Sequence, residues 1–108
     1  MDIDPMKALA TLAKAGPEYA KARGARCLLE EQIKITRAEV MSKSQAQAAN
    51  AREQEALCSH EYRAAVEAWA HAVEVEEGLR RKMATAEAAI ELFRTLEASN
   101  RRMDKGAA

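Results

Sequence analysis

Few side chains in this sequence have the chemistry to bind a metal ion or to act as a nucleophile. The two histidines, His60 and His71, stand eleven residues apart, and neither has another histidine or a cysteine three or four residues away. Cys58 and His60 could supply two ligands at one helix start, but a structural zinc site needs four. A nucleophilic Cys–His pair also needs an oxyanion site and a concave pocket, which two packed helices rarely provide. We therefore expect no metal, no cofactor and no enzymatic activity.

The densest carboxylates are Glu74, Glu76 and Glu77. Paired acids can serve as general acid and base when burial separates their pKa values, but a solvated acidic face is the simpler interpretation here. Glu76 differs from its neighbours because it falls on an apolar stripe, as Arg26 does earlier in the chain. If the chain reverses near residue 50, Arg26 and Glu76 would approach each other and could fix the register of two helices. Alternatively, both long side chains could extend to the solvent.

Basic residues gather near both ends of the sequence although the formal net charge is zero. In an antiparallel hairpin these ends would meet and form a basic pole that could hold phosphates. The same residues could instead only complement the dipole at a helix C-terminus. The sequence contains no glycine-rich phosphate loop, zinc finger or clear helix-turn-helix pattern. The predicted pole consists of Lys21, Arg23, Arg26, Arg94, Arg101, Arg102 and Lys105.

Two apolar stripes, in which the spacing alternates between three and four residues, indicate the helices that must position these residues. Such a spacing averages 3.5 residues and is typical of a helix that packs along a coiled-coil seam. The first stripe is Tyr19, Ala22, Arg26, Leu29, Ile33, Thr36 and Val40, and the second is Tyr62, Ala65, Trp69, Ala72, Glu76, Leu79, Met83, Ala86, Ile90 and Phe93. We expect the second stripe to mediate self-association, with Tyr62, Trp69, Leu79, Met83, Ile90 and Phe93 as its main contacts.

The amino-acid composition agrees with an all-α chain whose stability depends on association with a second copy of the chain. Of the 108 residues, 25 are alanine, the best helix former, against four glycines and two prolines. Leucine, isoleucine, valine and phenylalanine total only 17, enough for a narrow seam but too few for a deep core. The sequence therefore predicts an antiparallel, coiled-coil-like helical hairpin that forms a homo-oligomer.

Helix boundary signals divide this hairpin into segments. Asp4-Pro5 resembles a helix start and Gly16-Pro17 a stop, which predicts a short arm helix at 5–14 within an arm segment 1–16. Pro17 would open the hairpin segment, 17–100, whose first helix ends near Met41. The hairpin could turn near 44–50, with a short polar helix following, or at 58–59. Ser59 is a candidate cap for a helix over 60–99, and we expect a basic flexible tail at 101–108.

Nothing in the sequence indicates secretion or a membrane. The first residues lack the basic start and apolar run of a signal peptide, and no apolar stretch reaches the length of a membrane span. Cys27 and Cys58 stand outside any CxxC pairing, so reduced and half-buried thiols are expected, with a disulfide as the less favoured alternative. These features favour a protein of the cytoplasm.

Two segments, GARCLLEEQIKITRAEVM (24–41) and REQEALCSHEYRAAVEAWAHAVEVEEGLRRKMATAEAAIELFRTLEASNR (52–101), resemble a family of small phage and prophage proteins. The shared features are the acidic-basic helix, the REQEA-like segment, the EY start of the long helix and the FRTLEASNR-like ending. This chain departs from the family pattern at His60, where proline is common, and at Arg81, where an aromatic residue is common. The resemblance carries over no functional residue.

The resemblance implies an accessory role in DNA recombination or replication in the cytoplasm of a bacterial host, because such genes tend to lie near recombination and single-strand-binding genes. The expected partners are a second copy of the chain and single-stranded DNA, or a recombination or single-strand-binding protein, without a membrane. A protein-binding role, as an inhibitor of a host enzyme or a virion scaffold, is the alternative. In that case the acidic stretch from Glu67 to Glu77 would attract the partner.

Overall fold

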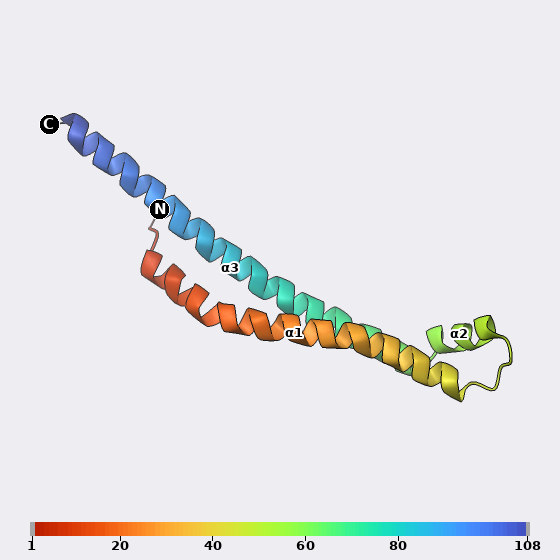
Figure 1. Cartoon of the computed structure of the whole chain (residues 1–108). Helices are drawn as coiled ribbons and strands as arrows, with labels where there is room; N and C mark the ends of the chain where they lie inside the picture. The colour runs from red at the N-terminus through yellow and green to blue at the C-terminus, as the bar shows by residue number, and fades with distance from the viewer. Residues whose placement is uncertain (1, 108) are drawn as a thin grey trace. The chain divides into compact units, whose positions relative to one another are not determined.

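A computed structural model describes residues 2–107 and is helical over nearly all of them. Helix α1 spans Pro5–Lys43, α2 spans Ala49–Leu57 and α3 spans His60–Ala107 (Figure 1). No strand occurs within the described residues. Over the same part of the chain, no helix is both long and apolar enough to cross a membrane. The predicted all-α class is confirmed.

The two long helices pass through two compact units. Residues 20–77 form one unit, which contains the chain reversal and is called the turn unit. Met1–Tyr19 together with Gly78–Ala108 form the other, called the terminal unit. Each unit pairs a part of α1 with a part of α3.

In the turn unit, α1 and α3 pack as an antiparallel hairpin. Arg26 bonds to Glu76, and Glu30, one turn further along α1, bonds to Trp69, about two turns earlier on α3. Rising residue numbers on α1 thus oppose falling numbers on α3. From Ala22 to Val40 the first stripe lies on the contact side, with Thr36 buried and the other five positions half-buried. The predicted hairpin is confirmed.

The terminal unit repeats this antiparallel packing. Ala8 lies beside Ala86, and Ile3 lies beside Phe93. Ala8, Ala15 and Ala86 are buried here. Alanines at the contact positions allow two helices to approach closely, but they bury little apolar area each.

The prediction of a separate arm helix is wrong, because α1 continues through Gly16 and Pro17 to Lys43. The start is as expected, since the Asp4 carboxylate accepts hydrogen bonds from the backbone N–H groups of Met6 and Lys7, both at 3.1 Å. Of the apolar residues in this stretch, Leu12 is half-buried, whereas Leu9 and Ala13 are exposed.

The contact side of the first 15 residues of α1 instead extends the first stripe. Counting back from Tyr19 in the same steps of four and three reaches Ala15, Leu12, Ala8 and Pro5, all of them buried or half-buried. One stripe therefore spans all of α1. Packing along it favours helix on both sides of Pro17 despite the N–H that proline lacks.

The chain reverses in two steps, so both predicted turn positions are used. Residues 44–48 leave the helix, α2 follows, and Cys58 and Ser59 separate α2 from α3. The Arg52 guanidinium holds the first bend by donating to the carbonyls of Ala46 and Gln47 at 3.2 and 3.0 Å. The Ser59 hydroxyl accepts from the Tyr62 N–H at 3.1 Å, which confirms the predicted cap.

The C-terminal segment expected to be a flexible tail is helical, since α3 continues to Ala107. The helix-friendly composition of this segment explains the difference, because only Gly106 interrupts it before the described residues end. Residues 101–106 are all exposed.

Candidate functional site

All ten positions of the second stripe are buried or half-buried. Ala72, Glu76 and Ala86 are buried, and the six residues expected to bind a second copy (Tyr62, Trp69, Leu79, Met83, Ile90 and Phe93) are half-buried. The contacts lie within the chain: Tyr62 and Trp69 lie beside Ile33 in the turn unit, and Phe93 lies beside Ile3 in the terminal unit. The stripe is therefore a seam of the hairpin itself, and its use between protomers stays a prediction.

The most polar part of the seam is a four-residue network in the turn unit. Arg26 Nε and Nη2 donate to the two carboxylate oxygens of Glu76 at 2.7 and 3.2 Å. Arg26 Nη1 donates to Glu30 Oε1 at 3.0 Å, and the Trp69 indole N–H donates to the same oxygen at 3.3 Å. Of the two interpretations of Arg26 and Glu76, the structure supports the paired one. Glu76 is 8% exposed, so its carboxylate is not held in bulk water.

Charges in this network stabilise one another. The hydrogen bonds that Arg26 donates to Glu76, and then the one to Glu30, raise the pKa of Arg26. The hydrogen bond from Trp69, and then the one from Arg26, lower the pKa of Glu30. All three guanidinium nitrogens of Arg26 already face carboxylates. Arg26 therefore serves hairpin packing, and its charge is compensated before any anion approaches.

The structure divides the other predicted pole residues between the two units. Lys21 and Arg23 are exposed in the turn unit, whereas Arg94, Arg101, Arg102 and Lys105 are exposed in the terminal unit. Arg94 also pairs with Glu91 at 3.0 Å, with both side chains more than 70% exposed. Convergence of the two groups into one pole stays a prediction.

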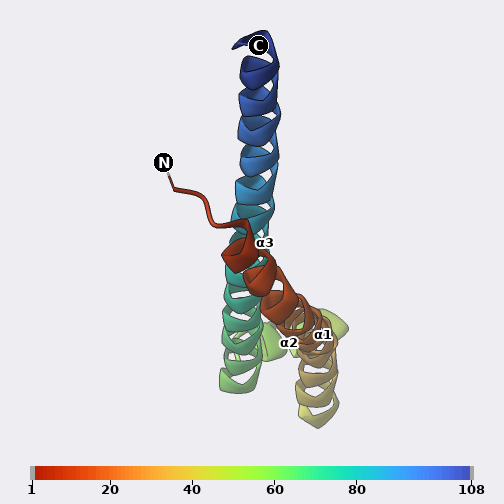
Figure 2. The ribbon, with the colours of Figure 1, turned by 90° about the vertical axis from the view of Figure 1, so that its left-hand side faces the viewer.

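Within the terminal unit, the last turns of α3 extend past the N-terminal segment. Asp2 and Ile3 lie beside Phe93, Leu96 and Asn100, and the blue end of α3 continues beyond them (Figures 1 and 2). Arg101, Arg102 and Lys105 therefore stand on helical turns without a covering helix among the described residues. We call residues 101–106 the basic helical end. These cations were expected in a flexible tail, and their helical spacing was not predicted from the sequence.

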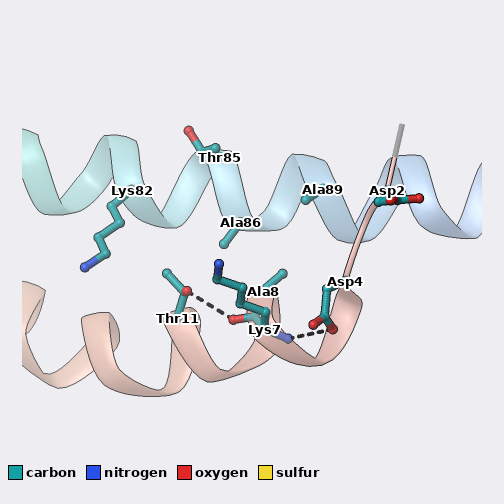
Figure 3. Close-up of a pocket in the computed structure, with 9 residues that line it drawn as sticks. All are labelled: Asp2, Asp4, Lys7, Ala8, Thr11, Lys82, Thr85, Ala86 and Ala89. Carbon is teal, nitrogen blue, oxygen red and sulfur yellow. Dashed lines mark hydrogen bonds between the residues drawn. The ribbon is translucent and has the colours of Figure 1, made fainter.

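Figure 3 shows an open groove of about 600 Å³ between α1 and α3 of the terminal unit. Its floor is Ala8, Ala86 and Ala89, and its rim carries charges of both signs, including Lys7 and Lys82. The rim hydroxyl of Thr11 donates to the Lys7 carbonyl at 3.1 Å, and Asp4 is occupied in capping α1. Thr11 and Asp4 thus bond to the backbone of α1.

A second groove, of about 350 Å³, lies in the turn unit and is almost purely apolar. It is lined by Ala22, Ala25, Leu29, Ala68, His71, Ala72 and Val75. The sequence stripes describe only the seam and missed this surface beside it. Part of the signal was present, because apolar residues stand on the row next to each stripe: Ala25, Leu28 and Ile35 beside the first, and Ala64, Ala68 and Val75 beside the second.

The remaining candidates for chemistry lie apart from one another. Among residues 2–107, no group of three histidine, cysteine or acidic side chains is placed to hold a metal ion. Cys27 and Cys58 are free thiols and exposed, so their expected half-burial is wrong. In the acidic stretch, Glu67 and Glu74 are exposed, whereas Glu76 is buried against Arg26.

Comparison with known proteins gives no family for this chain: no family model, no curated protein and no solved structure matches it.

Proposed function

We propose that this chain is a non-enzymatic accessory protein of phage DNA recombination or replication, which acts as an oligomer in the cytoplasm of the bacterial host. It contacts single-stranded DNA, or the protein that coats it, through the basic helical end. The observation that carries the proposal is the exposure of Arg101, Arg102 and Lys105 on helical turns that extend past the N-terminal segment. The resemblance of two segments to phage proteins supplies the biological setting.

The number of cations limits the expected affinity. Three basic side chains at one helix end neutralise only a few phosphates, so one copy binds weakly and its affinity falls steeply with salt. Linking several helical ends in one oligomer raises the effective concentration of each contact without a new interaction. Binding is therefore expected mainly from the assembled form.

Base stacking contributes little to this proposed binding. The chain has four aromatic residues, and all four are half-buried on the two stripes: Tyr19, Tyr62, Trp69 and Phe93. Proteins that hold single strands by stacking present aromatic faces to successive bases. An electrostatic contact with little sequence preference is the expected mode.

The test is fluorescence anisotropy with labelled single strands of mixed sequence, at low and moderate salt. The variant Arg101→Glu, Arg102→Glu reverses two charges of the basic helical end. We expect its affinity to fall at least about tenfold at low salt, because two phosphate contacts become repulsive. The matched control is Arg81→Glu, Lys82→Glu, which reverses two neighbouring exposed cations elsewhere on α3.

An equal loss of DNA affinity in both double variants would show that only the total charge of the chain matters. It would exclude the basic helical end as the binding site. Absence of binding by the unmodified chain at low salt would leave only a role through a protein partner.

A protein partner is the second candidate function, and one observation favours it. Leu28, Ile35 and Val75 are large apolar side chains that are 72%, 49% and 44% exposed in the turn unit. Exposed apolar residues close together often mark a protein-binding surface. Such a partner would fit an inhibitor of a host enzyme or a virion scaffold. A pull-down from nuclease-treated lysate, with stoichiometric recovery of one host protein, would favour this function over DNA binding.

A further inference from the structure

We propose that two copies of the chain associate through one side of the turn unit whose centre is apolar. This surface, called the alanine face, has one row on α1 and one on α3: Ala25, Leu28 and Ile35, and Ala64, Ala68 and Val75. The proposal deepens the self-association that the proposed function requires, and it replaces the second stripe by a different surface.

The alanine face follows from helix geometry. Residues 25, 28 and 35 are separated by steps of three and seven, so they share one side of α1. Residues 64, 68 and 75 are separated by steps of four and seven and share one side of α3. Ala25, Ala68 and Val75 line the same apolar groove, which places the two rows on the same side of the hairpin.

The shape of the alanine face is self-complementary. It carries a groove of about 350 Å³ whose walls are mostly alanine. Beside the groove on α1 stands Leu28, whose side chain is 72% exposed. A leucine from one copy can enter the alanine-lined groove of the other, as a knob enters a hole between packed helices. A two-fold axis makes both insertions at once and closes the assembly as a dimer.

The distribution of charge points to the same side of the hairpin. The six residues that define the alanine face are uncharged. The same sides of the two helices also carry His71, which lines the groove, and Lys21 and Glu39, which stand toward the ends of the α1 row. The opposite side of α1 carries Arg23, Glu30, Lys34 and Arg37, spaced to form a charged strip. The apolar centre of the alanine face fits an apolar partner surface, and the same face of a second copy has this character.

The exposed surface is large enough to accommodate such a contact. The chain exposes 8240 Å². A compact monomer of 11.9 kDa is expected to expose only about 5900 Å². The excess of about 2300 Å² per copy is above the roughly 800 Å² that each partner contributes to a standard interface. Large side chains that one hairpin leaves half-exposed gain further burial in the dimer.

The experiment is sedimentation equilibrium of the full chain over a wide concentration range, without DNA. The variant Leu28→Arg places a charge in the centre of the alanine face, and Val75→Arg does the same from α3. The matched control is Met6→Arg, because Met6 is 71% exposed on α1 but lies in the terminal unit. Circular dichroism establishes that each variant keeps its helix content.

We expect the unmodified chain and Met6→Arg to form the same dimer, and the dissociation constants of Leu28→Arg and Val75→Arg to rise at least about tenfold. A strictly monomeric unmodified chain would overturn the inference. So would a dimer that Leu28→Arg and Val75→Arg leave unchanged, because the interface would then lie elsewhere. Failure of DNA binding in the anisotropy experiment leaves this result untouched, since no DNA is present.

Discussion

Arg26 and Glu76 illustrate how charged residues on an apolar stripe can define a hairpin. Their side chains are only 23% and 11% exposed, and the guanidinium faces both oxygens of the carboxylate. A shift of one turn along the seam would separate the charges and leave both partly desolvated, which is costly. The pair therefore specifies register more than it adds net stability.

Glu76→Gln tests this role by removing the charge while keeping the size of the side chain. We expect its Tm to fall by several degrees, because Arg26 keeps its charge in a poorly solvated place. Glu91→Gln is the control, since the Arg94–Glu91 pair is of similar length, 3.0 Å against 2.7 Å, but more than 70% exposed. Exposed pairs contribute little, so that Tm should move by about 1 °C or less. Equal shifts in thermal unfolding of the two variants would contradict the register role.

The ionisation of the Glu30 carboxyl makes the stability of the folded chain depend on pH. Trp69 and Arg26 hold the pKa of this carboxyl below its ordinary value of 4.5. A depressed folded-state pKa contributes stability above the unfolded-state pKa, and this contribution is lost as the pH falls through the folded-state value. Thermal unfolding of Glu30→Gln should therefore show a lower Tm than the unmodified chain near neutral pH. The difference should shrink below pH 4.5, and a constant difference across this range would contradict the assignment.

At the scale of elements, α1 shows how packing outweighs a local stop signal. Gly16 and Pro17 are both weak helix formers, and together they predict a break. The stripe nevertheless continues without a change of spacing from Pro5 to Val40, and its positions are buried or half-buried throughout. The tertiary contact along this stripe favours one helix where local propensity favours two.

The Pro17→Ala variant distinguishes one helix that continues through residue 17 from two helices that meet there. In a continuous helix the substitution restores a backbone hydrogen bond and removes a clash, so the free energy of unfolding should rise by about 1–3 kcal/mol. Pro5→Ala is the control, because proline at the first helical position costs nothing and should show no such gain. Urea unfolding measures both. A loss of stability in Pro17→Ala would instead indicate that Pro17 begins a separate helix.

At the scale of the whole molecule, the described residues include no large side chain that is fully buried. The buried apolar residues are alanines, namely Ala8, Ala15, Ala56, Ala72 and Ala86. Each contributes little buried area, whereas ordering a long chain into helix costs conformational entropy at every residue. A hairpin with this core is stabilised when a partner buries more of its apolar surface, so its free energy of unfolding is coupled to assembly.

The thermal stability of the unmodified chain should therefore depend on its concentration. We expect the Tm, followed by circular dichroism, to rise by a few degrees over about a hundredfold increase in concentration, because assembly binds only the folded form. Leu28→Arg should show a Tm that does not change over this range. A concentration-independent Tm in both proteins would show that the hairpin is stable alone.

The sequence by itself determined the helical class, both stripes, the Asp4 and Ser59 caps and the two candidate positions of the chain reversal. These features depend on the spacing of apolar residues and on hydrogen bonds within a few residues, which are local properties. The two-step reversal also agrees with the polar composition of 42–56, which offers nothing to bury.

Only the tertiary structure decided what the stripes pack against, that α1 continues through Pro17, that Arg26 is paired with Glu76 and Glu30, and that an alanine-lined groove opens beside the seam. Each of these depends on contacts between residues of α1 and residues of α3 that are far apart in the chain. Spacing shows that a helix has an apolar side, but the covering surface is chosen by the free energy of packing two helices together.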